Sequence, residues 1–156
     1  MPRCISCQKK LLCEDCGAVI EQPTPAIDCD VAPFVPSGYT VESHKKGGQF
    51  VWDASKVELY LDDEQRKSFI RGTELLEKLE GEKVLNANVL DYLLKNPHLI
   101  PEEWKGKYIF FWGTVYRHAG GSLYVRYLRW DGSSWYWDYR WLGSAWNASS
   151  PAALAS

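Results

Sequence analysis

The sequence predicts an α+β fold, an aromatic-rich antiparallel β-meander of three to four strands packed with two to three short helices. Residues 107–142 contain runs that alternate with a period of two between Gly-Ser turns. Residues 62–104 instead contain short stretches with helical spacing and helix-start residues. The 156 residues include eight Trp, nine Tyr and five Phe, side chains that build either a core or a contact surface.

Composition divides the chain into a zinc-knuckle-like Cys4 segment at residues 1–17, a proline-rich linker at 18–38 and the α+β domain at 39–156. The first segment holds four of the five cysteines, and the linker holds four of the eight prolines. Proline favours an extended backbone, so the linker is either a semi-stiff tether or a segment that packs back on the domain. The apolar residues available for such packing are Ile27, Val31, Phe34 and Val35.

The first elements of the domain are a strand and two short helices. Residues 56–61 alternate as a strand does, after a turn at 53–55. Asp62 and Gln65 have the spacing of a capping box, and a helix to about Arg71 follows. We expect Thr73 to cap a second helix, "ELLEKLE", which Gly81 ends in a left-handed conformation.

Residues 85–104 carry the clearest helical pattern. Asn88 is the expected cap of a helix that presents an apolar stripe and stops near Lys95, because Pro97 disfavours helical backbone at the residue before it. Pro101 begins a further short helix that Trp104 anchors.

Three strands follow, "YIFFWGTVYR", "LYVRYLRW" and "WYWDYRWL", joined by "HAGGS" and "DGSS" turns. The first is apolar on both faces and is therefore expected at the centre, while residues 57–61 are expected at an edge. The motif Arg-Trp-x-Gly-Ser-x-Trp occurs at 129–135 and at 140–146, which indicates two bends of one meander. In the third strand Trp135, Trp137, Tyr139 and Trp141 share one face, and Tyr136, Asp138 and Arg140 share the other.

The cysteine spacing predicts a structural zinc site. Two Cys-x-x-Cys turns separated by five residues supply the four thiolates of a tetrahedral site, in which no position stays open for catalysis. The separation is shorter than the fifteen to twenty residues usual in zinc ribbons, so an iron–sulfur cluster, redox-active dithiols or an unoccupied pair remain alternatives. The predicted ligands are Cys4, Cys7, Cys13 and Cys16.

Charge and hydropathy restrict the function. The net charge of −2 excludes a uniformly basic nucleic-acid wrapper, and no apolar run reaches the length of about 18 residues that a membrane helix needs. The first residues carry cysteines and lack the apolar core of a signal peptide, so we expect a cytoplasmic protein that does not contact a membrane. The sequence leaves the oligomeric state open.

No constellation of catalytic residues is recognisable. His44, His98 and His118 lie far apart, and the acid pairs 62–63 and 102–103 are explained as helix-start residues. The chain is therefore expected to be a non-enzymatic macromolecule-binding module.

Nucleic acid is the first expected partner. Residues 104–142 contain six bases and two acids, interleaved with rings that can stack on unpaired bases. A protein-interaction adaptor or regulator is the alternative, because Trp, Tyr and Arg also anchor protein interfaces. Carbohydrate binding ranks third and an enzyme last. The candidate binding residues are Arg117, Arg126, Arg129, Arg140, Tyr124, Trp130 and Tyr136.

Residues 48–156 show a resemblance. The text "GGQFVWDASKVELYL", "NPHLIPEEWKGKYIFFWGTVYR", "LYVRYLRW" and "SPAALAS" resembles a group of uncharacterised short proteins of bacteria with very reduced genomes. The resemblance implies no activity and no site residues, and it does not include the cysteine segment.

Overall fold

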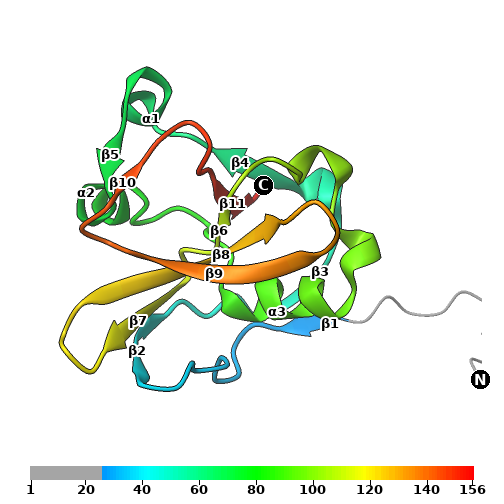
Figure 1. Cartoon of the computed structure of the whole chain (residues 1–156). Helices are drawn as coiled ribbons and strands as arrows, with labels where there is room; N and C mark the ends of the chain where they lie inside the picture. Colours follow the sequence, from blue (N-terminus) through cyan, green and yellow to red (C-terminus); the bar gives the residue numbers. More distant parts are fainter. Residues whose placement is uncertain (1–25) are drawn as a thin grey trace, which may run out of the picture.

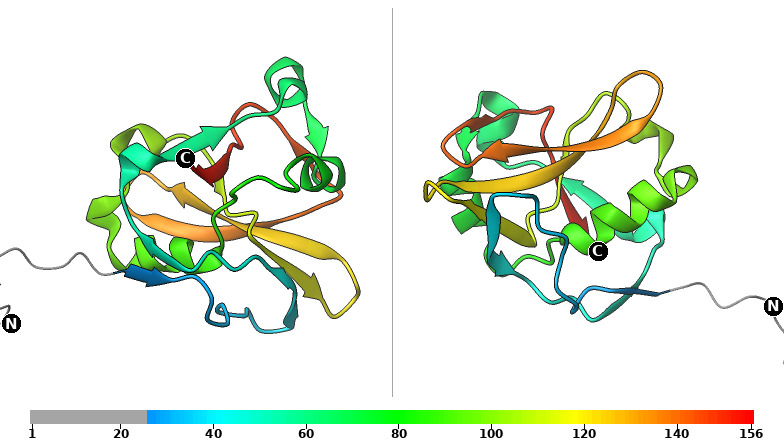
Figure 2. Two further views of the ribbon diagram at one scale, coloured as in Figure 1. Left: turned by 180° about the vertical axis from the view of Figure 1, so that it is seen from behind. Right: turned by 60° about the horizontal axis from the view of Figure 1, so that its bottom comes forward.

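The computed structural model describes residues 26–156, which form one curled mixed sheet with short helices on both of its faces (Figure 1, Figure 2). The α+β class, the aromatic-rich sheet and the short helices are confirmed. Within this range seven strands run in the order β2-β7-β8-β6-β11-β4, and β9 pairs with β8. The sheet is thus larger than the predicted meander, and it is not purely antiparallel, because β6 and β11 pair in parallel.

The centre of the sheet is built from β6 (Ile109–Phe110), β7 (Thr114–His118) and β8 (Leu123–Trp130). The single strand expected over 108–117 is interrupted at 111–113, and its two halves pair with different ends of β8. On the opposite edge of β8 lies β9 (Trp135–Trp141), in continuous antiparallel register. The boundaries of β8 and β9 follow the alternating runs of the sequence.

Three further strands complete the sheet, and two small strand pairs flank it. β2 (Tyr39–His44) pairs with β7, and β11 (Ala152–Ala155) lies between β6 and the edge strand β4 (Val57–Tyr60). Two small pairs lie beside the sheet, β1 (Ala26–Asp28) with β3 (Gln49–Val51), and β5 (Ile70–Arg71) with β10 (Ala145–Trp146). Residues 26–28 of the proline-rich segment thus belong to a strand pair.

The helices differ from the prediction mainly at their ends. The capping box of Asp62 and Gln65 is confirmed, but α1 (Asp63–Lys67) ends four residues earlier than expected, because β5 follows it. The prediction that Thr73 caps the second helix was wrong. α2 (Gly72–Lys78) begins one residue before Thr73, although Gly81 does have a positive φ of 87°.

The longest helix, α3 (Ala87–Lys95), is capped by Asn86 and not by Asn88, because the Asn86 side chain accepts the Asn88 N–H at 3.0 Å. It stops at Lys95 as Pro97 requires. Three short 3₁₀ turns occur at Ala54–Lys56, Pro97–Leu99 and Glu102–Trp104, and Trp104 is buried as the expected anchor.

Two hydrophobic clusters lie on the two faces of the sheet. α3 packs on one face through Val89, Leu90 and Leu93, next to Ile109 and Leu128. α2 and β10 cover the other face, where Leu75 and Trp146 meet Phe110, Trp112 and Val125. Adjacent residues of 109–112 thus enter opposite clusters, which confirms the central position expected from a run apolar on both faces.

Candidate binding surface of the β8–β9 hairpin

The β8–β9 hairpin carries most of the candidate binding residues, and its register assigns each one to a face. On one face of the sheet, Tyr124 of β8 lies opposite Trp141 of β9, and Trp130 lies opposite Trp135. The other face carries Arg129 opposite Tyr136. Both faces therefore hold rings, and we describe them as two surfaces. The aromatic surface comprises Phe34, Tyr39, Tyr124, Trp137, Tyr139 and Trp141, and the arginine–tyrosine surface comprises Tyr108, Tyr127, Arg129, Tyr136, Asp138 and Arg140.

The aromatic surface is a set of edge-to-face contacts that remains partly open to solvent. The Tyr39 ring lies 5.5 Å from Tyr124 and 5.3 Å from Tyr139, and Phe34 lies 6.0 Å from Trp137. Burial raises the pKa of Tyr39, and its contact with Tyr139 adds to the rise, so the phenol stays neutral. Trp141 is 50% exposed and Tyr139 40%, high values for such large rings.

On the arginine–tyrosine surface each guanidinium lies against rings. Arg129 stacks over Tyr108 and Tyr136, with its carbon Cζ 5.1 and 5.2 Å from the ring centres. Arg140 lies 4.8 Å from the Phe110 centre and donates to Ser150 Oγ at 3.0 Å. Burial lowers the pKa of Arg140, while Tyr127, Tyr108 and Asp138 oppose that shift. Within residues 26–156 neither arginine forms an ion pair with a carboxylate.

The other two candidate arginines are paired. Arg126 is 1% exposed and makes a bidentate contact with Asp91 of α3, at 2.8 and 3.1 Å. Arg117 is exposed at the end of β7, where it contacts Glu42 of β2 at 2.9 Å. Trp130 is half-buried. Its ring centre lies 5.5 Å from that of Trp135, and the Lys105 ammonium lies 4.0 Å from it. The charges of Arg117 and Arg126 are thus used inside the domain.

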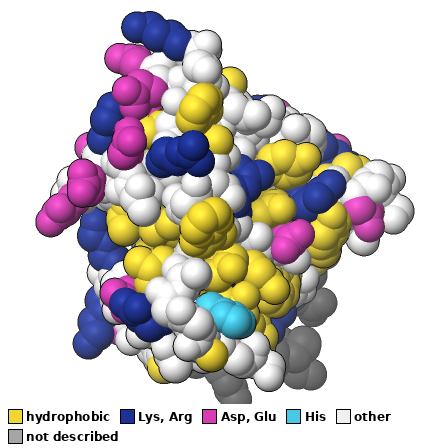
Figure 3. Space-filling model, turned by 60° about the vertical axis from the view of Figure 1, so that its left-hand side comes forward, with side chains coloured by type: hydrophobic (Ala, Val, Ile, Leu, Met, Phe, Trp, Pro, Cys, Tyr) yellow, Lys and Arg dark blue, Asp and Glu magenta, His cyan; other side chains and the backbone are white. Residues whose placement is uncertain are grey.

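Figure 3 shows one side of the molecule, on which hydrophobic side chains gather beside charged ones. A continuous hydrophobic area with a histidine at its margin adjoins an area in which basic, acidic and hydrophobic side chains alternate. His118 contacts Tyr39 at 5.0 Å, so it borders the aromatic surface. The sequence could not place Phe34 and Tyr39 here, because Phe34 lies before β2 and Tyr39 begins β2, and neither has a periodic relation to β8 or β9.

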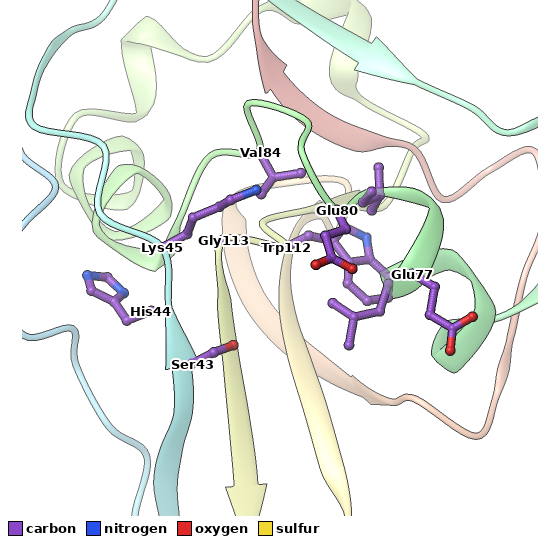
Figure 4. Close-up of a pocket in the computed structure, with 10 residues that line it drawn as sticks. Ser43, His44, Lys45, Glu77, Glu80, Val84, Trp112 and Gly113 are labelled. Carbon is purple, nitrogen blue, oxygen red and sulfur yellow. The ribbon is translucent and has the colours of Figure 1, made fainter.

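A cavity of about 450 Å³ lies between β2 and α2 (Figure 4). Lys45 lines it on the β2 side, Glu77 and Glu80 on the α2 side, and Trp112 between them. Two of its polar side chains are engaged within the described part of the chain. His44 contacts Thr114 Oγ1 and the Cys29 carbonyl through its two ring nitrogens. Lys45 donates to the Glu82 carbonyl at 2.8 Å. We therefore do not assign the function to this cavity.

The remaining candidate groups give no metal or membrane site in the described range. The four cysteines of the predicted zinc site lie outside residues 26–156. Within that range no three His, Cys, Asp or Glu side chains gather as metal ligands, and no helix is long and apolar enough to cross a membrane. Cys29 is buried in the core, and burial together with Asp30 and Asp28 raises the pKa of its thiol to about 11.

Comparisons with known proteins give no family assignment. No protein-family model, no curated protein and no solved structure matches the chain. The residues of the hairpin are therefore the basis on which a function is proposed.

Proposed function

We propose that the chain is a non-enzymatic protein-binding module whose contact surface is the aromatic surface of the β8–β9 hairpin. The observation that supports this is the exposure of Tyr139 and Trp141, which project from one strand as neighbours on the same face. Tyr and Trp are enriched among the residues that dominate protein interfaces, since each buries a large area at a low cost in side-chain entropy.

Charge favours protein over nucleic acid as the partner. A nucleic-acid surface needs cations that can neutralise phosphates. Arg126 is buried against Asp91, and Arg117 is paired with Glu42. The aromatic surface is therefore poor in free cations.

Nucleic acid is the second candidate, on the arginine–tyrosine surface. Arg129 and Arg140 lie among tyrosines there without an ion pair to any carboxylate of residues 26–156. Both guanidiniums lie against aromatic rings, as an arginine that also contacts stacked bases would. This candidate requires binding that weakens steeply with salt.

The test is selection of binders by the full chain from a phage-displayed library of random peptides, together with titration of labelled single-stranded oligonucleotides at low and high salt. We expect selected peptides whose affinity falls on Trp141→Ser by about 2 kcal/mol, roughly thirtyfold in Kd. Phe69→Ser is the matched control, because Phe69 is equally exposed, at 49%, but lies outside the hairpin.

Two results would contradict the proposal. Peptide binding that is indifferent to Trp141→Ser would remove the hairpin from the site. Salt-dependent binding of oligonucleotides without any selected peptide would favour the second candidate. Near-ultraviolet circular dichroism of each variant verifies that the fold is retained.

A further inference from the structure

The outer edge of β9 presents backbone groups that the described part of the chain leaves mostly unbonded. The Leu142 N–H donates to the Leu123 carbonyl at 2.9 Å, and the Asp131 N–H to the Ser134 carbonyl at 3.1 Å. These two bonds fix the alternation along β9, because successive residues of a strand direct their N–H and C=O groups to opposite sides. The backbone N–H and C=O groups of Tyr136, Asp138 and Arg140 point toward β8. The backbone groups that point away from β8 belong to Trp135, Trp137, Tyr139 and Trp141.

Few of the outward groups have a partner among residues 26–156. The Tyr139 N–H donates to the carboxylate of the adjacent Asp138 at 2.7 Å, and the Trp141 carbonyl accepts from Ser144 at 2.9 Å. In the same range β8 is the only strand that pairs with β9. The right-hand view of Figure 2 places β9 at the margin of the sheet.

β9 differs from the other two edge strands of the sheet. β2 carries an irregularity between Val41 and Ser43, and β4 has only four residues. Bulges and short length are common ways in which proteins keep an edge strand from pairing with another chain. β9 has seven residues in unbroken register with β8, and five of them are strand-favouring aromatic residues, so it lacks this protection.

The charges of β9 fit a second copy of the same strand. Its two charged residues, Asp138 and Arg140, lie two positions apart on one face. If two β9 strands pair antiparallel about a twofold axis at Tyr139, Asp138 of each copy lies directly opposite Arg140 of the other. An axis at Asp138 or at Arg140 would instead set like charges against each other, which is unfavourable across strands.

We infer that β9 pairs with β9 of a second copy, antiparallel and centred on Tyr139, so that the two sheets join in a homodimer. The outward backbone N–H and C=O groups of one β9 then face those of the other, and Trp137 lies opposite Trp141 of the second copy. The Tyr139 N–H bonds the carbonyl of its counterpart, which releases the Asp138 carboxylate toward Arg140 across the axis. This inference rests on the proposed function, since it names the partner of the same hairpin.

The decisive experiment is sedimentation equilibrium of the full chain at micromolar concentrations, for wild type, Asp138→Lys, Arg140→Glu and an equimolar mixture of the two variants. We expect a wild-type dimer and at least about tenfold weaker self-association of each variant, because each sets like charges opposite each other. The mixture should recover dimerisation. In a mixed dimer the introduced lysine lies opposite the introduced glutamate, and the remaining native Arg140 lies opposite the remaining native Asp138. Recovery also demonstrates that both variants fold.

Glu42→Lys is the matched control, since it makes the same change of charge on the other long edge strand, β2, and should leave the dimer intact. A monomeric wild type, single variants that dimerise as wild type does, or a mixture that stays monomeric would each overturn the inference. A monomer that still selects peptides through Trp141 would leave the proposed function standing. A monomer that selects none would overturn both.

Discussion

Arg126 holds three parts of the molecule together through one side chain. Its guanidinium donates to both carboxylate oxygens of Asp91 and contacts the rings of Phe34 and Trp137, 5.1 and 4.2 Å from their centres. It thereby connects the sheet to α3 and to the segment before β2. A buried guanidinium needs such a carboxylate, since an unpaired charge in the interior is costly.

The sequence could not distinguish Arg126 from the other three candidate arginines, Arg117, Arg129 and Arg140. All four lie in aromatic runs, and alternation assigns each to a face without showing which elements cover that face. Asp91 is 35 residues away, on α3. The burial of Arg126 follows from how α3 packs on the sheet, which is a property of tertiary structure and leaves no local signal.

Asp91→Ala should lower the free energy of unfolding by about 3 kcal/mol, the low end for a broken buried pair, because the Asp91 side chain is 28% exposed. Urea unfolding followed by Trp fluorescence measures the change. Glu42→Ala, which breaks the exposed pair with Arg117, should cost only about 0–1 kcal/mol. Equal costs for the two variants would show that Arg126 does not depend on Asp91.

Among the elements, those encoded by local pattern were predictable. β8 and β9 match their alternating runs, β4 lies within the predicted strand at 56–61, and the capping box starts α1. Each of these depends on neighbouring residues only, through side-chain alternation or a cap that bonds its own helix.

Elements that depend on distant partners were missed or misplaced. β11 reads "AALA", a composition with little strand preference, and it becomes a strand because β6 and β4 lie on its two sides. α1 ends early because residues 70–71 pair with β10. Asn86 caps α3 in place of Asn88, and its amide also donates to the carbonyls of Cys29 and Lys45, contacts that only the folded chain creates.

The start of α1 should make stability depend on pH. Burial alone would raise the pKa of Asp62, but the Glu64 N–H and the Lys78 ammonium stabilise the carboxylate more, so its pKa is lowered in the folded state. A lowered folded pKa adds stability that is fully present above the unfolded value of about 3.9 and is lost as pH falls through the folded value.

Asp62→Asn should keep the cap, because Asn also accepts the helix N–H, while it removes this titration. Urea unfolding at several pH values between neutral and about 3 should then show a smaller loss of stability on acidification than in wild type. Glu58→Gln, at an exposed position of β4, is a control for the general effect of removing one acid. Identical acid profiles for Asp62→Asn and wild type would contradict the assignment.

At the scale of the whole molecule, the sheet depends on pairings far apart in sequence. Residue 110 pairs with 152 in parallel, and the sheet ends at strands that begin at residues 39 and 57. A meander is the simplest order that consecutive strands allow, and the observed order needs chain crossovers that hairpin-type turn signals do not encode. Fold class was therefore predictable, whereas topology and the identity of the solvent-exposed rings were not.

The separation between the cysteine segment and the domain at 26–156 leads to a prediction on zinc. Residues 26–156 have two hydrophobic clusters of their own, so their folding should not depend on the cysteines at 4, 7, 13 and 16. We expect the purified full chain to contain one zinc ion, measured by mass spectrometry, and Cys7→Ser with Cys13→Ser to abolish it.

In that double variant, urea unfolding monitored by Trp fluorescence should have the same midpoint as in wild type, because all eight tryptophans lie within residues 52–146. Iron with visible absorption in place of zinc would indicate a cluster instead. A chain without metal, or a shifted midpoint in the double variant, would show that the cysteine segment either binds no metal or contributes to the stability of the domain. The two measurements together therefore separate a zinc site carried beside the domain from one on which the domain depends.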